Sequence, residues 1–227
     1  MDFKILIADS NTEATLGLKG IFKTKGYIIY TATNGDEAYK IATNELIHLI
    51  ITEINLPGLD GFSLCKTLRA EGFINPIVFL TDKESETSAI LGLEIGAQDY
   101  IRKSLKINEV IARVELQLKT LLSKAANKKV MIKDLEVDIE RRTVTYRGKI
   151  NELTTKEFQV FYKLAQSPKK VFSREELLTG IWGHSSSSNT RTLDIHIGYL
   201  RKKIEEEPNR PKLFRTIRGV GYCLEID

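Results

Sequence analysis

Short runs of apolar residues, each ending at a polar residue, alternate with helical patterns through the first half of the chain. The apolar runs cover residues 3–8, 27–32, 48–52, 76–80 and 100–101. Between and after them, apolar residues recur at helical spacing around residues 16–22, 36–43, 62–70, 84–95 and 106–122. Continuously apolar strands that alternate with helices are typical of a parallel sheet covered on both faces. The pattern predicts a doubly wound, five-stranded α/β domain over residues 1–122.

A short basic stretch, residues 123–129, is the predicted linker, and the pattern changes after it. Short β segments at 130–138 and 143–149 precede two helices that open at Thr154 and Ser173, each with the spacing of a capping box. A basic amphipathic helix over 191–204 and a glycine-containing hairpin over 214–225 follow. Helix, loop, helix and hairpin is the order of a winged-helix domain. We therefore expect a second, α+β domain over residues 130–227.

Charge is divided unevenly between the two halves. Residues 1–121 hold 13 Lys and Arg against 16 Asp and Glu, a net −3, whereas residues 122–227 hold 21 against 14, a net +7. This asymmetry hints at a nucleic-acid-binding second half. The two cysteines suggest neither a disulfide framework nor a metal knot, and no apolar run approaches the roughly 20 residues of a membrane span. We expect a cytoplasmic protein that does not contact a membrane.

Polar residues at the carboxyl ends of the predicted strands are the candidate site of the first domain. Ligands of open α/β sheets bind at this edge, where the strand order reverses. The residues there are Asp9, Ser10, Glu53, Thr81, Asp82 and Lys103. A flavin-phosphate loop after the first strand is a weaker interpretation, because residues 10–15 contain no glycine for close backbone approach.

The segments that contain these residues resemble the receiver domain of bacterial response regulators. They are Ile5–Asp9, Ile54–Gly61, Leu80–Thr81 and Gly96–Lys103. The resemblance implies a phosphoacceptor aspartate after the third strand, two acidic Mg²⁺ ligands after the first, a Thr or Ser after the fourth and a Lys after the fifth. This chain matches at Asp9, Thr81 and Lys103, but it has Glu53 at the acceptor position and Ser10 at the second acidic position.

These two departures predict a receiver that does not autophosphorylate in the usual way, with weak or absent Mg²⁺ binding. Glutamate moves the carboxylate by about 1.5 Å, and a misplacement near 1 Å can cost on the order of 100-fold in rate. Ser10 removes an oxygen ligand that suits Mg²⁺. Three interpretations stay open: Glu53 mimics the phosphorylated state, the pocket is a relic in a dimerisation module, or Glu53 is still phosphorylated weakly.

The resemblance also implies a homodimer face on the fourth helix, fifth strand and fifth helix. Asp99 and Arg113 occupy the positions of one expected charge pair. Glu109 is one member of a second expected pair, but Ala89 stands at the position of its usual basic partner on the fourth helix. With fewer charges, apolar contacts from Ile90, Leu93 and Val110 are expected to matter more, although at least one of Ile90 and Leu93 is expected in the core. Tyr100 matches the aromatic switch position.

The helix over 191–204 has one apolar face, Leu193, Ile197, Leu200 and Ile204. Its other face carries several basic residues, as a helix in the major groove of DNA would. Residues 130–227 resemble the DNA-binding domain of OmpR/PhoB response regulators, most specifically at 153–158, 171–178, 191–197 and 216–222. The predicted DNA-facing residues are Arg191, Thr192, His196, Tyr199, Arg201, Lys202, Lys203, Trp182, Thr216 and Arg218. His196 has an equal alternative as a packing residue. The resemblance also implies that loop 185–189 could contact RNA polymerase.

Together these observations predict a transcription regulator and not an enzyme. We expect it to bind double-stranded DNA, at direct repeats, as a dimer that forms through the receiver without phosphorylation. The alternative is a conventional two-component response regulator that a histidine kinase phosphorylates weakly.

Overall fold

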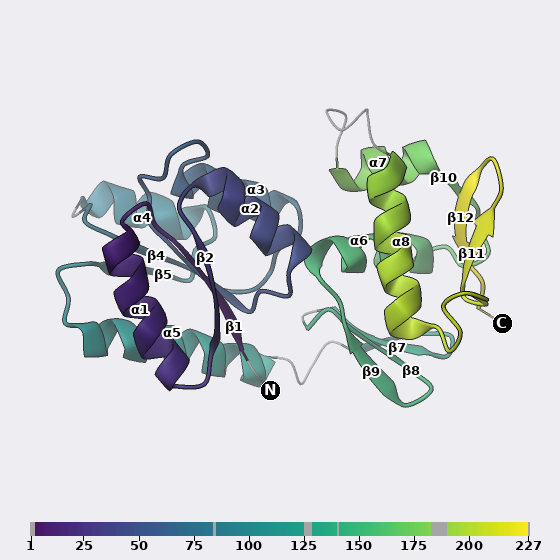
Figure 1. The fold of residues 1–227 in the computed structure, drawn as a ribbon, viewed down its shortest axis with the longest axis horizontal. Helices are drawn as coiled ribbons and strands as arrows, with labels where there is room; N and C mark the ends of the chain where they lie inside the picture. The colour runs from purple at the N-terminus through teal and green to yellow at the C-terminus, as the bar shows by residue number, and fades with distance from the viewer. Residues whose placement is uncertain (1–2, 84, 125–128, 140, 183–189, 227) are drawn as a thin grey trace. The chain divides into compact units, whose positions relative to one another are not determined.

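The computed structural model describes residues 3–83, 85–124, 129–139, 141–182 and 190–226. The chain divides into two compact units, Met1–Ala126 and Asn127–Asp227, called unit 1 and unit 2 here (Figure 1). No helix of the described residues is long and apolar enough to cross a membrane. The predicted Ser185–Asn189 loop lies outside the described residues.

Unit 1 contains five parallel strands in the order β2-β1-β3-β4-β5, with a helix after each strand. Its elements are β1 (Lys4–Ala8), α1 (Thr12–Thr24), β2 (Ile28–Ala32), α2 (Gly35–Asn44), β3 (Leu49–Thr52), α3 (Gly61–Ala70), β4 (Ile77–Thr81), α4 (Glu86–Glu94), β5 (Asp99–Arg102) and α5 (Ile107–Lys124). The predicted doubly wound fold is therefore confirmed.

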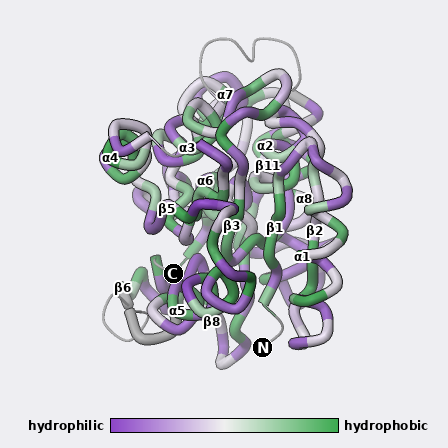
Figure 2. Tube along the Cα trace, turned by 90° about the vertical axis from the view of Figure 1, so that its left-hand side faces the viewer, coloured by the Kyte–Doolittle hydropathy of each residue, from purple (hydrophilic) through white to green (hydrophobic). Residues whose placement is uncertain are grey.

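Two apolar layers hold this sheet, one on each face. Side chains of α1 and α5 pack with Ile5, Ile7 and neighbouring inward-facing residues on one face, and α2 and α3 pack against Leu6 and Ile50 on the other. The central strands are buried along their whole length, which explains their unbroken apolar pattern. Figure 2 shows β1 and β3 as largely hydrophobic tubes.

Backbone hydrogen bonds continue beyond the strand ends and bring the polar residues there together. The amide of Glu53 donates to the carbonyl oxygen of Ala8 at 2.8 Å, and the amide of Lys103 donates to that of Thr81 at 2.9 Å. These bonds bring the carboxyl ends of β1, β3, β4 and β5 to one edge. The residues at these strand ends, which all belong to unit 1, form the candidate pocket.

Over its described residues, unit 2 contains a four-stranded antiparallel sheet, three helices and a three-stranded sheet that includes the C-terminal hairpin. Its elements are β6 (Lys129–Ile132), β7 (Leu135–Asp138), β8 (Thr143–Tyr146), β9 (Lys149–Glu152), α6 (Thr155–Ala165), β10 (Phe172–Ser173), α7 (Arg174–Trp182), α8 (Thr190–Ile204), β11 (Phe214–Ile217) and β12 (Gly221–Leu224). The predicted winged-helix class is confirmed.

Three boundaries differ from the sequence prediction. Residues 130–138 form two strands instead of one, because Lys133 has a positive φ of 55° and reverses the chain without a glycine. Helix α5 reaches Lys124, and β6 begins at Lys129. Only residues 125–128 of the predicted linker thus lie between these elements, and they are outside the described residues.

One apolar core joins β7, β8, α6, β10, α7, α8, β11 and β12 of unit 2. The predicted apolar face of α8 is its centre, since Leu193, Ile197, Leu200 and Ile204 are each at most 3% exposed. Thr154 and Glu157 form the predicted capping box at the start of α6. Because α8 uses this whole face for the core, its opposite face is free for another function.

Gly35→Ala should destabilise unit 1 strongly. A Cβ at Gly35 would lie 1.6 Å from the carbonyl oxygen of Leu59, so the loop after Glu53 must move. We expect a loss of at least about 2 kcal/mol in the free energy of unfolding, measured by urea titration with circular dichroism. The matched control is Gly20→Ala in α1, where no atom lies within 4 Å of the new Cβ and alanine should stabilise by roughly 0.5–1 kcal/mol. Equal effects of the two substitutions would contradict this account.

Candidate functional site

The ammonium of Lys103 lies between two carboxylates at the edge of the unit 1 sheet. Its Nζ is 2.8 Å from Oδ2 of Asp9 and 2.7 Å from Oε2 of Glu53, and both carboxylates are largely buried. Asp82 is more distant, at 3.7 Å, and its side chain is exposed. The structure therefore brings four of the six predicted pocket residues, Asp9, Glu53, Lys103 and Thr81, into one hydrogen-bonded cluster.

The second oxygen of Glu53 is also occupied. Oε1 accepts hydrogen bonds from the hydroxyl of Thr81 and, at 2.6 Å, from the backbone amide of Ile54. Burial alone would raise the pKa of Glu53, but the hydrogen bonds from Lys103, Thr81 and Ile54 outweigh it and lower that pKa. Glu53 is thus an ionised carboxylate whose two oxygens are held by separate donors.

The pKa of Lys103 is raised, because its hydrogen bonds also favour the charged form. Burial would lower its pKa, but the hydrogen bonds to Asp9 and Glu53 raise it above the ordinary value. The ammonium therefore remains charged throughout the physiological range.

The oxygen donors of this cluster do not fit a magnesium site. Asp9 uses Oδ1 to accept the amide of Asn11 at 2.8 Å and Oδ2 for Lys103. Ser10, at the position of a second acid, is exposed and neutral. Within the described part of the chain, no group of three His, Cys, Asp or Glu residues is arranged to hold a metal ion. A divalent cation would have to displace the Lys103 ammonium from both carboxylates.

A chain of hydrogen bonds leads from Glu53 to Tyr100. The hydroxyl of Thr81 donates to Glu53 and accepts the amide of Lys83 at 3.1 Å, and the carbonyl oxygen of Lys83 accepts the hydroxyl of Tyr100 at 2.8 Å. The Tyr100 ring also lies 6.2 Å from that of Phe79. The pocket and β5 are therefore connected through the loop after β4.

The predicted dimer face contains more exposed apolar surface than expected. Ile90 and Leu93 are 51% and 50% exposed, so neither is the core residue that the sequence suggested. Val110 was predicted to make apolar contacts across the dimer, but it is buried against the sheet. Arg113 pairs within the chain, at 3.4 Å from Asp99 and 3.0 Å from Glu109.

Helix α8 and the hairpin are bound to each other by Arg201. Its guanidinium donates to the carbonyl oxygen of Phe214 at 3.0 Å and to the hydroxyl of Thr216 at 2.6 Å. Arg201 and Thr216 were both predicted to contact DNA, and the structure brings these two side chains together. Arg191, Tyr199, Lys202 and Arg218 are exposed, and Thr192 is half-buried.

The structure favours the packing alternative for His196, and it corrects the placement of Lys203 on the exposed face. His196 is only 5% exposed, its ring is 5.5 Å from that of Trp182, and its Nδ1 has no hydrogen-bond partner among the described residues. Lys203 donates to Glu157 at 2.6 Å and to the carbonyl oxygen of Glu152 at 3.0 Å. Lys203 thus contacts α6, whereas the His196 ring packs against Trp182 of α7.

Sequence reasoning missed two structural groups in this region. The carboxylate of Glu205 accepts the amides of Lys212, Leu213 and Phe214 at 2.8–3.0 Å and so fixes the start of the hairpin. Asp194 accepts the hydroxyl of Tyr222 at 2.6 Å. The contacts of Glu205 could not be predicted from a local sequence pattern, because its partners lie seven to nine residues away. Asp194 could have been singled out, because it is an acid on a basic helix.

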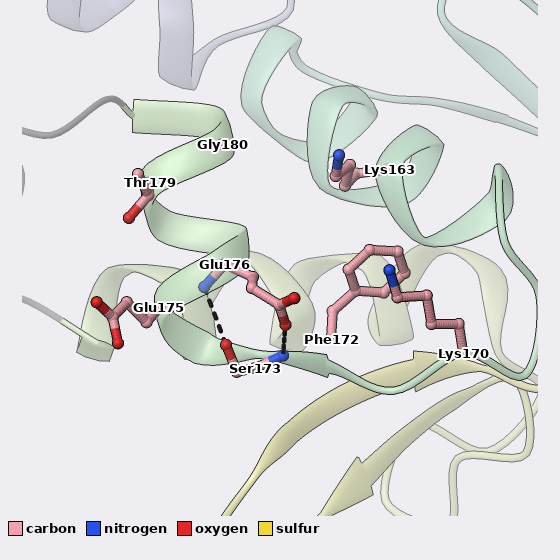
Figure 3. Close-up of a pocket in the computed structure, with 8 residues that line it drawn as sticks. All are labelled: Lys163, Lys170, Phe172, Ser173, Glu175, Glu176, Thr179 and Gly180. Atoms are coloured by element: carbon pink, nitrogen blue, oxygen red, sulfur yellow. Dashed lines mark hydrogen bonds between the residues drawn. The ribbon is translucent and has the colours of Figure 1, made fainter.

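A separate cavity of about 460 Å³ lies beside β10 and α7 (Figure 3). Lys163 and Lys170 line it near the Phe172 ring, and Glu175 and Glu176 are also among its lining residues. Glu176 is engaged by the amide of Ser173 at 2.6 Å. The two positive and two negative charges balance, so the cavity favours neither an anion nor a cation.

Comparisons with known proteins agree with this architecture. The model of the response regulator receiver domain matches residues 5–115, and that of the C-terminal domain of transcriptional regulatory proteins matches residues 148–224. The receiver domain of the Francisella response regulator 1452 is 31% identical over 52% of this chain and 98% of its own length, with a TM-score of 0.51. The chain belongs to the response regulators. The pairing of these two domains is that of the OmpR/PhoB type, so unit 1 is the receiver and unit 2 the DNA-binding domain.

Two full-length structures are also similar. DrrB, a Thermotoga maritima OmpR/PhoB homologue, is 28% identical over 99% of this chain and 100% of its own, with a TM-score of 0.48. A structure described as a novel family of redox sensors in the streptococci, evolved from two-component response regulators, is 24% identical over 98% and 99%, with a TM-score of 0.51. The second similarity concerns the fold alone.

Acid should destabilise the DNA-binding domain through His196. Burial lowers the pKa of His196 below 6.5, with a smaller opposing effect from Glu157 and a smaller lowering effect from Lys156. The folded state therefore binds a proton less readily than the unfolded chain, so this contribution to stability is complete above the unfolded pKa and decreases as the pH falls below it. Urea unfolding at pH 7.5 and 5.5, followed by the fluorescence of Trp182, the one tryptophan of the chain, should show this loss.

The matched control is His196→Gln, which cannot titrate. Its unfolding midpoint should change less between the two pH values than that of the wild type. If both proteins lose the same stability, the assignment to His196 is incorrect.

Proposed function

We propose that this response regulator is a DNA-binding transcription regulator whose receiver dimerises without phosphorylation. The observation that carries the proposal is the engagement of both Glu53 oxygens, one by Lys103 and one by Thr81. Asp9, Ser10, Glu53, Thr81 and Lys103 then form a pocket that provides an internal negative charge and takes no phosphoryl group. In this role the protein acts as a binding protein and not as an enzyme.

The chemistry of phosphoryl transfer supports this reading. A carboxylate nucleophile needs an oxygen in line with the donor phosphorus, together with cations that neutralise the transferred charge. Here the ammonium of Lys103 is already shared by Asp9 and Glu53. A phosphoryl donor would have to break these ion pairs and approach a largely buried glutamate that is a methylene longer than aspartate.

The connection to Tyr100 favours a phosphorylation mimic over an inert relic. An inert pocket would need no buried charge, because an ion pair in the interior costs desolvation energy that apolar packing would avoid. Glu53 instead holds Thr81, and the loop after β4 holds Tyr100 next to α4. We infer that Glu53, through Thr81, holds the backbone of Lys83 in the position that accepts the Tyr100 hydroxyl.

The dimer is proposed to form through α4, β5 and α5. Ile90, Leu91 and Leu93 expose apolar surface on α4, and a second copy of this face would cover it. Arg113, Asp99 and Glu109 lie on the neighbouring elements, where they would form the polar rim. A twofold contact of this kind is self-complementary.

The partner of unit 2 is proposed to be double-stranded DNA. Arg191, Tyr199 and Lys202 lie on the exposed face of α8, and Arg218 lies on the hairpin. Trp182, Thr192, Arg201, Thr216, Lys203 and His196 are proposed to support this surface. Two DNA-binding domains joined by a receiver dimer fit direct repeats, and such a regulator would act in the cytoplasm. Contact with RNA polymerase through residues 185–189 remains part of the proposal.

Dimerisation and DNA affinity should not respond to phosphoryl donors. We expect changes of less than about twofold when acetyl phosphate and Mg²⁺ are added to the full-length protein, measured by analytical ultracentrifugation and fluorescence anisotropy. A Glu53→Asp/Ser10→Asp double variant should gain a response, because it regains the nucleophile and the second acid. A large response of the wild type would instead support a conventional regulator that is weakly phosphorylated.

Glu53→Gln should weaken the receiver dimer by about tenfold. The amide keeps the shape of the side chain but loses the charge-assisted hydrogen bond to Lys103. Glu13→Gln, on an exposed turn of α1, is the control for a lost surface charge and should leave the dimer unchanged. An unchanged dimer in both variants would contradict the mimic and support the relic.

A further inference from the structure

The exposed face of α8 has an apolar centre between two cations. Ile195 and Tyr199 are 48% and 47% exposed, and they lie four residues apart on the same side of the helix. Arg191 precedes them by one turn, and Lys202 follows, so the two cations are about 16 Å apart along the axis. A helix whose polar surface served only for solubility would not place two large apolar side chains at this point.

The other cations of α8 are engaged inside the domain. Arg201 donates to Phe214 and Thr216, and Lys203 donates to Glu157 and Glu152. Neither is positioned to contact a base edge from the middle of the exposed face. A guanidinium that could donate two hydrogen bonds to guanine is therefore missing from the centre of this face, as far as the described residues of α8 extend.

Gly198 leaves space beside the two apolar residues. No heavy atom lies within 4 Å of a Cβ built at this position. The helix backbone can therefore approach a surface closely there, with Ile195 and Tyr199 in contact and the cations at either end. Lys202 Nζ lies 6.0 Å from the centre of the Tyr199 ring, and this contact holds the ring along the helix.

The major groove offers one apolar group that matches this surface, the C5 methyl group of thymine. Arg191 and Lys202 are far enough apart to reach phosphates on either side of the groove, and phosphate contacts fix position without reading sequence. Base selection then depends on the central apolar residues.

We propose that Ile195 and Tyr199 read thymine methyl groups, so that the protein prefers sites with thymines at the centre of each half-site. This inference rests on the proposed DNA-binding function and specifies its substrate. Ile195 and Tyr199 are the specificity-determining residues, Gly198 permits the close approach, and Arg191 and Lys202 supply affinity that does not depend on sequence.

Replacement of thymine by deoxyuridine tests the proposal, because it removes only the methyl group and leaves base pairing intact. Duplexes are first selected from a random pool with the full-length wild-type protein. The dissociation constants of the best duplex and of its deoxyuridine counterpart are then compared at one salt concentration. We expect the wild type to bind the deoxyuridine duplex roughly tenfold more weakly, since each buried methyl contributes on the order of a threefold to fourfold change.

Two variants separate direct contact from changes in DNA shape. Ile195→Ala should bind the two duplexes more equally, whereas Ile150→Ala, an exposed isoleucine on β9, should keep the wild-type ratio. Tyr199→Arg should shift the selected sites toward guanine.

Each remaining outcome is decisive. Equal binding of both duplexes by the wild type, or an unchanged ratio in Ile195→Ala, overturns the inference and leaves DNA binding intact. Failure to enrich any duplex overturns the proposed function itself, and the inference with it.

Discussion

The ammonium of Lys103 is the charge on which the organisation of the receiver pocket depends. Asp9 and Glu53 are largely buried, and each lies within 3 Å of the Lys103 ammonium. Without this cation between them, the two carboxylates would repel each other. The ion pairs also keep Glu53 ionised, and an ionised Glu53 can hold the hydroxyl of Thr81. In the proposed function the dimer face depends on this charge, because its removal would break the hydrogen-bonded link from Thr81 through Lys83 to Tyr100.

The DNA-binding domain follows a similar logic with different groups. Helix α8 uses one face for the core, one flank for the hairpin through Arg201, and the other flank for α6 through Lys203. Only the fourth side is left for a partner. Its apolar centre is thus a consequence of where the cations of the helix are already used.

Much of this arrangement could be predicted from the sequence because the signals were periodic. Unbroken apolar strands predicted the parallel sheet, and residues at their ends had to meet at one edge, so Asp9, Glu53, Thr81 and Lys103 could be predicted together. The positions of Ile90 and Lys203 could not, and the two alternatives for His196 stayed open, because exposure on a helix depends on which neighbouring element covers each flank. The turn at Lys133 lacked a glycine, and the contacts of Glu205 join residues too far apart for a local pattern.

The proposal that the Glu53 carboxylate takes the place of a phosphoryl group rests on its ion pair with Lys103 and its hydrogen bond with Thr81. Fluorine NMR of the full-length protein with beryllium fluoride and Mg²⁺ tests it most directly, because this tetrahedral phosphoryl analogue gives separate bound and free signals. The account predicts only free signals for the wild type and a bound signal for the Glu53→Asp/Ser10→Asp variant. A bound signal on the wild-type protein would contradict it.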